Sequence, residues 1–126
     1  MNEILTGQRI LVIEDDPVML DIIKQIISGV NAIASGVSSV EKGLHMSRCH
    51  EYDLIVLDRY MPDGDGHDVL RALKSNVATK DTPVLMLTGE TKSDQIRESI
   101  DLGAVGYIVK PFKPKDFIAW LEKILR

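Results

Sequence analysis

Short apolar runs alternate with longer segments of helical periodicity along the chain, and this alternation constrains the fold more than any other feature. Four runs are near-continuously apolar, a pattern typical of strands that are covered on both faces. They are RILVI from Arg9, DLIVLD from Asp53, PVLMLT from Pro83 and VGYIVK from Val105. A weaker segment around Ile33 and Ala34 is a candidate for a further strand.

Between and after these runs, apolar residues recur at helical spacing. The predicted helices are Pro17–Ile27, a segment that starts at Ser38 or Ser39, Gly66–Asn76, Ser93–Leu102 and Pro114–Leu125. Asp16, directly before Pro17, is the expected cap of the first helix. Strands that alternate with helices, joined by right-handed crossovers, form a parallel sheet with helices on both faces. The sequence therefore predicts a doubly wound α/β fold.

Length and charge restrict the class of protein. A chain of 126 residues fits one domain, residues 1–126, large enough to bury a core. Acids outnumber bases by 19 to 15, which argues against direct nucleic-acid binding. There is no signal peptide and no apolar run long enough for a bilayer. The single cysteine, Cys49, cannot form an internal disulfide. We expect a cytoplasmic protein that binds no membrane.

Polar residues follow the predicted strands where each one ends. In an open parallel sheet, ligands bind outside the carboxyl ends of the strands, so these residues should meet at one edge. Each alone has a structural explanation as a turn residue, a helix cap or a solvated charge. The first strand is followed by Glu14, Asp15 and the expected cap Asp16. The coincidence at one edge favours a functional site that contains Glu14, Asp15, Asp58, Thr88 and Lys110.

The residue types suggest phosphoryl chemistry. Carboxylates that share a cleft repel one another, so either their pKa values rise or a cation lies among them. Mg²⁺ is favoured over Ca²⁺, because Mg²⁺ is usually held by one or two protein carboxylates and several waters, whereas Ca²⁺ prefers a fuller set of protein oxygens. A metal ion and Lys110 together suit a doubly charged phosphoryl group. Asp58 is then a candidate nucleophile that forms an aspartyl phosphate.

Four motifs carry a resemblance that extends over essentially the whole chain. LVIEDD, LIVLDRYMPDGDG, VLMLTGE and YIVKPF occur in this order. With them the chain resembles the receiver domain of two-component response regulators, including the chemotaxis regulators. The resemblance implies a flavodoxin-like sheet of five parallel strands in the order 2-1-3-4-5, with five helices.

The resemblance also implies roles for individual residues. Asp58 is the expected phosphoacceptor and a ligand of Mg²⁺. Glu14 and Asp15 form the acidic pair, with Asp15 the more direct ligand, and the backbone carbonyl of Tyr60 is the expected third protein ligand. Thr88 and Lys110 are expected to receive the phosphoryl oxygens.

Further positions match the regulatory features of the family. Tyr107 lies where an aromatic switch turns inward as Thr88 moves. The Lys110–Pro111 bond corresponds to a cis peptide, with Pro111 in a structural role. Side chains at Tyr60 and Glu90 are expected to tune dephosphorylation, and the bulky ring of Tyr60 is expected to obstruct the attacking water.

The implied function is a phosphorylation-activated switch in a two-component phosphorelay. The expected donor is a sensor histidine kinase or a histidine phosphotransfer protein. The fourth helix, fifth strand and fifth helix would change shape to control an output protein or domain, or to form a homodimer. Such a domain is not an enzyme for outside substrates, because it catalyses only its own phosphorylation and dephosphorylation. The sequence is compatible with a stand-alone regulator and with a receiver in a longer protein.

Other interpretations are possible. The first is a receiver-like interaction module that works without phosphorylation. The second is a phosphatase or nucleotide enzyme on a similar sheet. A haloacid-dehalogenase-type phosphatase needs a second aspartate two residues after the nucleophile, where this chain has Tyr60, which argues against turnover of outside substrates. No glycine loop follows the first strand, so nucleotide binding has little support. In DGDGHD the acids lack calcium-loop spacing. Asp63 and Asp65 are therefore interpreted as turn and helix-start residues, with Gly64 and Gly66 giving backbone freedom.

Overall fold

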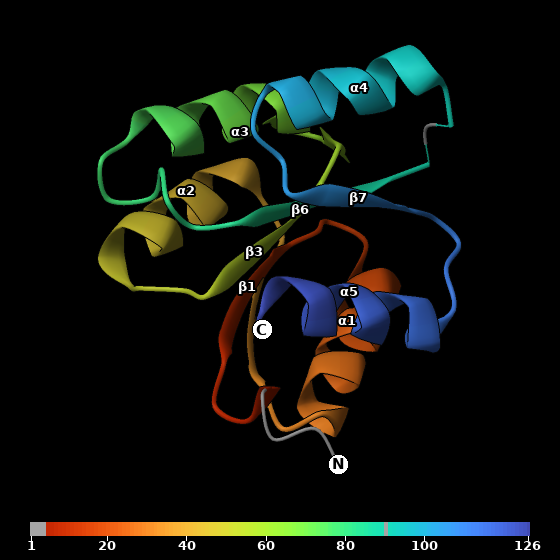
Figure 1. Cartoon of the computed structure of the whole chain (residues 1–126). Helices are drawn as coiled ribbons and strands as arrows, with labels where there is room; N and C mark the ends of the chain where they lie inside the picture. Colours follow the sequence, from red (N-terminus) through yellow and green to blue (C-terminus); the bar gives the residue numbers. More distant parts are fainter. Residues whose placement is uncertain (1–4, 90) are drawn as a thin grey trace.

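The computed structural model describes residues 5–89 and 91–126. In these ranges strands and helices alternate along the chain (Figure 1). The elements are β1 (Arg9–Ile13), α1 (Pro17–Gly29), β2 (Ile33–Val37), α2 (Val40–Cys49), β3 (Leu54–Asp58), β4 (Tyr60–Met61), β5 (Gly64–Asp65), α3 (Gly66–Ser75), β6 (Val84–Thr88), α4 (Ser93–Asp101), β7 (Gly106–Val109) and α5 (Pro114–Ile124).

The main sheet has the predicted topology. Among the described residues it contains five strands in the order β2-β1-β3-β6-β7, and every neighbouring pair is parallel. This is the order 2-1-3-4-5 once the two very short strands are set aside, so the doubly wound, flavodoxin-like prediction is confirmed. The short strands β4 and β5 pair antiparallel with each other in the loop after β3, a feature that the sequence did not predict.

The buried core forms two layers because successive strand residues point to opposite faces of the sheet. Ile10 and Val12 of β1 pack in the layer that contains α1 and α5. Leu11 and Ile13 pack in the layer that contains α3, with α2 against it. Figure 1 shows the same arrangement, with α1 and α5 on one face and α2, α3 and α4 on the other. The strands are thus covered on both faces, as their continuous apolar character predicts.

The helix boundaries lie within two residues of the predicted ones. α1 continues to Gly29, two residues past the predicted end at Ile27, and α3, α4 and α5 each end one residue earlier than expected. Asp16 caps α1 by accepting a hydrogen bond from Val18 N, as predicted. Asp65 likewise caps α3 by accepting from His67 N, at 2.8 Å.

The loop glycines serve a purpose other than the one expected. Neither Gly64 nor Gly66 has a positive φ, so neither uses the left-handed freedom of glycine. A Cβ at Gly66 would lie 2.8 Å from the carbonyl oxygen of Asp58 and 2.8 Å from Cα of Arg59. Gly66 is therefore needed because the start of α3 approaches the backbone beside Asp58 closely.

Among the described residues, no helix combines the length and the apolar character that a bilayer-spanning helix requires.

Candidate functional site

The parallel topology brings four of the strand-end residues to one edge of the sheet. Glu14 follows β1, Asp58 and Thr88 end β3 and β6, and Lys110 follows β7. The backbone on both sides of Asp58 is held, since β3 pairs with β1 and Arg59 N donates a 2.8 Å hydrogen bond to Leu87 O of β6. The carboxylate of Asp58 is therefore carried on rigid backbone.

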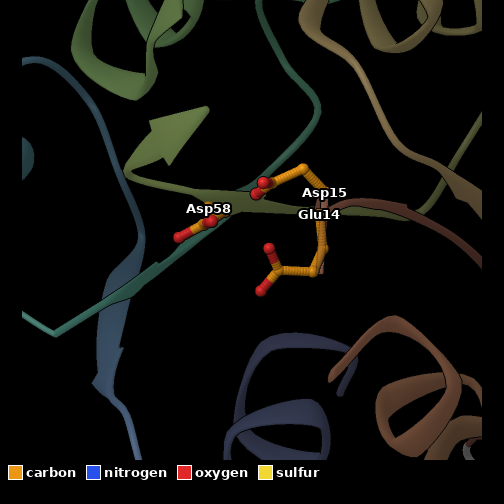
Figure 2. A group of neighbouring side chains, drawn as sticks. All are labelled: Glu14, Asp15 and Asp58. Atoms are coloured by element: carbon orange, nitrogen blue, oxygen red, sulfur yellow. The ribbon is translucent and has the colours of Figure 1, made fainter. Parts of the chain in front are cut away.

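Three carboxylates converge at this edge. Ligand oxygens of Glu14, Asp15 and Asp58 all lie within 4.8 Å of one another, and Figure 2 shows the side chains directed toward a common space. Glu14 is fully buried and Asp58 is 6% exposed, whereas Asp15 is half-buried. Oxygen donors at this spacing can bind a hard divalent cation.

Lys110 supplies the opposite charge. Its Nζ lies 2.8 Å from Oε1 of Glu14 and 3.0 Å from Oδ1 of Asp58. Burial lowers the pKa of Lys110, but hydrogen bonds to Glu14 and Asp58 outweigh burial, and the net shift of the pKa is upward. Lys110 is therefore a permanent cation in contact with the proposed phosphoacceptor.

The buried carboxyl of Glu14 has the reverse balance. Its pKa is raised, first by burial and then by the neighbouring carboxylate of Asp58, and the ammonium of Lys110 offsets only part of this. Together the three carboxylates and one ammonium leave the cluster with an excess of negative charge. A bound divalent cation would relieve that excess.

Thr88 and Tyr107 lie at the side of the site that faces α4. Thr88 is 6% exposed, and its backbone oxygen accepts a 2.8 Å hydrogen bond from Lys110 N. Tyr107 is a half-buried residue of β7. Both side chains line a small cavity with residues of α4. The structure thus places the proposed switch pair together.

The other residues predicted for the site have different surroundings. Tyr60 begins β4 and is 54% exposed, and the guanidinium carbon of Arg59 lies 4.8 Å from the centroid of its ring. The Lys110–Pro111 peptide bond is cis. Glu90 lies outside the described residues.

Sequence reasoning missed a set of polar contacts beside the site. The buried Arg59 pairs with Asp65. Nε2 of the buried His67 lies 2.7 Å from Oγ of Ser99. The arginine directly after the expected phosphoacceptor, Asp58, is the available signal. Its partner on α4 could not be identified from spacing.

Asp63 also differs from its interpretation as a simple turn residue. Its carboxylate accepts hydrogen bonds from the backbone N–H groups of Val40 and Glu41, at 3.0 and 3.2 Å. These bonds lower the pKa of Asp63. Asp63 is thus a remote cap of α2 and not a ligand of the cluster.

Comparison with known proteins identifies related sequences over most of the chain. A family model for the response regulator receiver domain matches residues 10–122. The transcriptional activator protein IrlR of Burkholderia pseudomallei is 36% identical over 118 residues, which are 94% of this chain and 50% of that protein. The chemotaxis protein CheY of Pseudomonas aeruginosa is 35% identical over 119 residues, 92% of this chain and 94% of that protein. The chain therefore spans about half the length of the first relative and nearly all of the second.

Solved structures show the same fold. The chemotaxis response regulator CheY4 of Vibrio cholerae superposes with a TM-score of 0.89 at 25% identity, covering 94% of this chain and 99% of that one. A CheY-like receiver domain protein from Methanospirillum hungatei gives 0.88 at 26% identity, covering 95% and 94%.

Proposed function

This chain belongs to the response regulator receiver domain family, and we propose that it is a phosphorylation-activated switch with Asp58 as its phosphoacceptor. The observation that carries the proposal is the contact of the buried Asp58 carboxylate with Lys110, at 3.0 Å, inside a cluster of three acids. A nucleophilic carboxylate beside a fixed cation is suited to accept a phosphoryl group.

The chain's own residues account for most of the proposed transfer. A carboxylate oxygen of Asp58 forms a bond to phosphorus, while the bond from phosphorus to the donor breaks and its electron pair leaves with the donor. Lys110 neutralises charge on the phosphoryl oxygens, and the hydroxyl of Thr88 donates a hydrogen bond to one of them. Because Asp58 pairs with Leu87 of β6 and the preceding Leu57 pairs with Ile13 of β1, little reorganisation is needed.

The acidic cluster fits Mg²⁺. Asp15 and Asp58, with the backbone carbonyl of Tyr60, would be the protein ligands, and Glu14 would act through water. Bound there, Mg²⁺ supplies positive charge for the phosphoryl oxygens. A site with few carboxylates and one half-buried, accessible acid suits Mg²⁺ better than Ca²⁺, which takes a fuller set of protein oxygens.

Signalling follows from a shift between two arrangements of the domain. Thr88 moves toward the phosphoryl group, Tyr107 turns into the space behind it, and the surface of α4, β7 and α5 changes. That surface controls an output protein or domain, or a second copy of the chain. The donor is a sensor histidine kinase or a histidine phosphotransfer protein, and residues 1–126 act as one receiver domain in the cytoplasm. The domain turns over no outside substrate.

The test is phosphorylation by a small donor. Incubation with acetyl phosphate and Mg²⁺ should add one phosphoryl group to the wild-type chain, detected by intact-protein mass spectrometry. Asp58→Asn should abolish the gain, and Asp68→Asn, at an exposed position of α3, should preserve it. No gain in the wild type would contradict the proposal and favour an interaction module that works without phosphorylation.

A further inference from the structure

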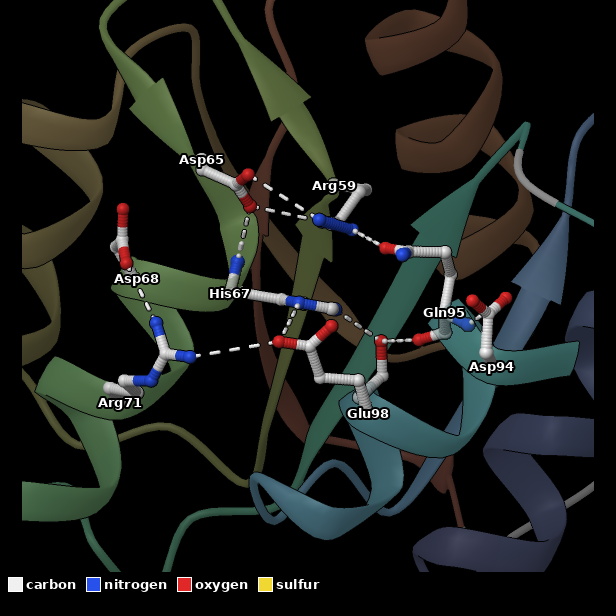
Figure 3. Close-up of polar contacts among 9 residues, drawn as sticks. Arg59, Asp65, His67, Asp68, Arg71, Asp94, Gln95 and Glu98 are labelled. Carbon is white, nitrogen blue, oxygen red and sulfur yellow. Dashed lines mark hydrogen bonds and ion pairs between the residues drawn. The ribbon is translucent and has the colours of Figure 1, made fainter. Parts of the chain in front are cut away.

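Arg59, the residue directly after Asp58, connects the site to α4. Its Nε lies 2.9 Å from Oδ1 of Asp65, and Nη2 donates to Oδ2 of the same carboxylate at 3.4 Å. Nη1 donates to Oε1 of Gln95 on α4, at 3.3 Å. Figure 3 shows the guanidinium between Asp65 on one side and Gln95 on the other. The side chain is only 9% exposed.

Asp65 of β5 holds the guanidinium in place, so the guanidinium cannot follow α4 when that helix moves. Asp65 holds it with both carboxylate oxygens, a geometry that lysine cannot reproduce. Asp65 is itself fixed, because Oδ1 also accepts the 2.8 Å hydrogen bond from His67 N that caps α3. If α4 moves away, the bond to Gln95 is therefore the contact of Arg59 that breaks.

Helix α4 depends on such polar contacts because it buries little apolar surface. Within its described residues, Ser99 is the buried one, and Ile96 is the single apolar residue among the half-buried Gln95, Ile96 and Glu98. The C-terminal half is held by Ser99, whose Oγ lies 2.7 Å from Nε2 of His67. The bond from Arg59 holds the N-terminal half.

The space behind Thr88 is nearly filled in this arrangement. A cavity of about 10 Å³ is lined by Arg59, Thr88, Gln95, Ile96, Ser99 and Tyr107. A cavity of this size has room for about one water molecule and not for a phenol ring. An inward turn of Tyr107 therefore requires the Gln95 and Ile96 side of α4 to move outward.

We propose that Arg59 is a positioning residue whose hydrogen bond to Gln95 holds α4 in the resting arrangement and opposes the inward turn of Tyr107. The consequence for signalling rests on the proposed function, since it assumes that phosphorylation of Asp58 favours the inward state. The Arg59–Gln95 bond then sets how much of the inward state exists before phosphorylation.

The experiment removes the bond from the α4 side, so that the charge beside Asp58 is unchanged. Gln95→Met loses the acceptor and keeps the length of the side chain, whereas Gln95→Glu keeps an acceptor for Arg59. Gln25→Met on α1 is the matched control, because Gln25 is an exposed glutamine with a 2.8 Å bond to a residue of its own helix, Asp21.

Amide hydrogen exchange of the unphosphorylated proteins gives the first readout. In Gln95→Met the amides of the N-terminal half of α4, including Ile96, should exchange about tenfold faster, as expected for one lost hydrogen bond to a charged donor. Gln95→Glu and Gln25→Met should leave them unchanged or slower. Equal α4 exchange in Gln95→Met and Gln95→Glu would overturn the inference.

The NMR resonances of the Tyr107 ring give a second readout. General loosening of α4 would not shift these resonances in a defined direction. In unphosphorylated Gln95→Met they should shift toward their positions in the phosphorylated wild type, while those of Gln95→Glu should not. A shift in any other direction, or none, would overturn the switch part of the inference. If the wild type accepts no phosphoryl group, the proposed function fails, and the exchange comparison still decides whether Arg59 positions α4.

Discussion

Two residues in the segment after Asp58, Tyr60 and His67, each lead to a prediction at the scale of a single side chain. Tyr60 is the first. Tyr60 is 54% exposed and the guanidinium of Arg59 lies over its ring, and we predict that the ring hinders water that approaches the proposed acceptor Asp58. Tyr60→Asn should speed hydrolysis of the phosphorylated chain about fivefold, corresponding to roughly 1 kcal/mol of barrier. The decay of phosphoprotein after removal of the donor measures this rate. Tyr60→Phe, which keeps the ring, should decay like the wild type, and equal decay of all three would refute the role of the ring.

His67 is the second, and it gives a pH dependence. Its pKa is lowered from its ordinary value of 6.5, first by burial and then by Arg59, while Glu98 and Asp65 act in the opposite direction. Glu98 lies 3.6 Å from Nδ1 and also 3.7 Å from Arg71, which shares its charge. The unfolded chain therefore binds a proton more readily than the folded one.

The sign of the effect follows from this difference in proton binding. The stability contributed by neutral His67 is complete above about pH 6.5 and is lost as the pH falls toward the lower pKa of the folded state. The free energy of urea unfolding should thus fall more steeply in the wild type than in His67→Gln as the pH is lowered from roughly 7 to roughly 5, a range that includes the ordinary pKa of histidine. Parallel pH profiles would show that His67 does not titrate on unfolding.

At the scale of elements, the position of the start of α3 depends on Gly66. A Cβ at Gly66 would meet backbone atoms of Asp58 and Arg59, which cannot move aside as a flexible side chain could. Gly66→Ala should lower the free energy of unfolding by about 1–3 kcal/mol, the usual range for overpacking. It should also slow phosphorylation, because the backbone beside Asp58 must shift.

Gly29→Ala is the control for that substitution. Gly29 lies in α1, and a Cβ there meets nothing within 4 Å, so alanine should be neutral or stabilise the helix by up to about 1 kcal/mol. Urea denaturation of the two variants beside the wild type checks both values. Equal stability of the Gly66→Ala and Gly29→Ala variants would contradict the close-approach argument.

At the scale of the whole molecule, the acidic cluster should couple metal binding to folding. Because the proposed site exists only in the folded chain, Mg²⁺ that binds there should stabilise the fold by about 2.7 kcal/mol at a hundredfold excess over Kd. Thermal unfolding with and without Mg²⁺ measures this gain. Asp15→Asn should lose most of it, while Asp21→Asn, at an exposed position on α1, should keep it. A gain unaffected by Asp15→Asn would place the ion elsewhere.

The sequence predicted the architecture well because its signals are local. Apolar runs mark strands that are covered on both faces, and Asp16 and Asp65 act as the helix caps that their positions suggest. Given parallel strands, Glu14, Asp58, Thr88 and Lys110 must lie at one edge of the sheet, whatever the details of packing.

Other features depend on how elements far apart in the sequence are placed against each other. Asp63 caps α2 across 23 residues, and Arg59 reaches Gln95 across 36. Such contacts depend on the rotation and offset of one helix against another, which no periodic pattern encodes. The sequence by itself thus determined the order of the elements and the residues at the carboxyl edge of the sheet. Only the tertiary structure decided how α4 is held beside that edge, because this depends on side chains meeting across packed elements.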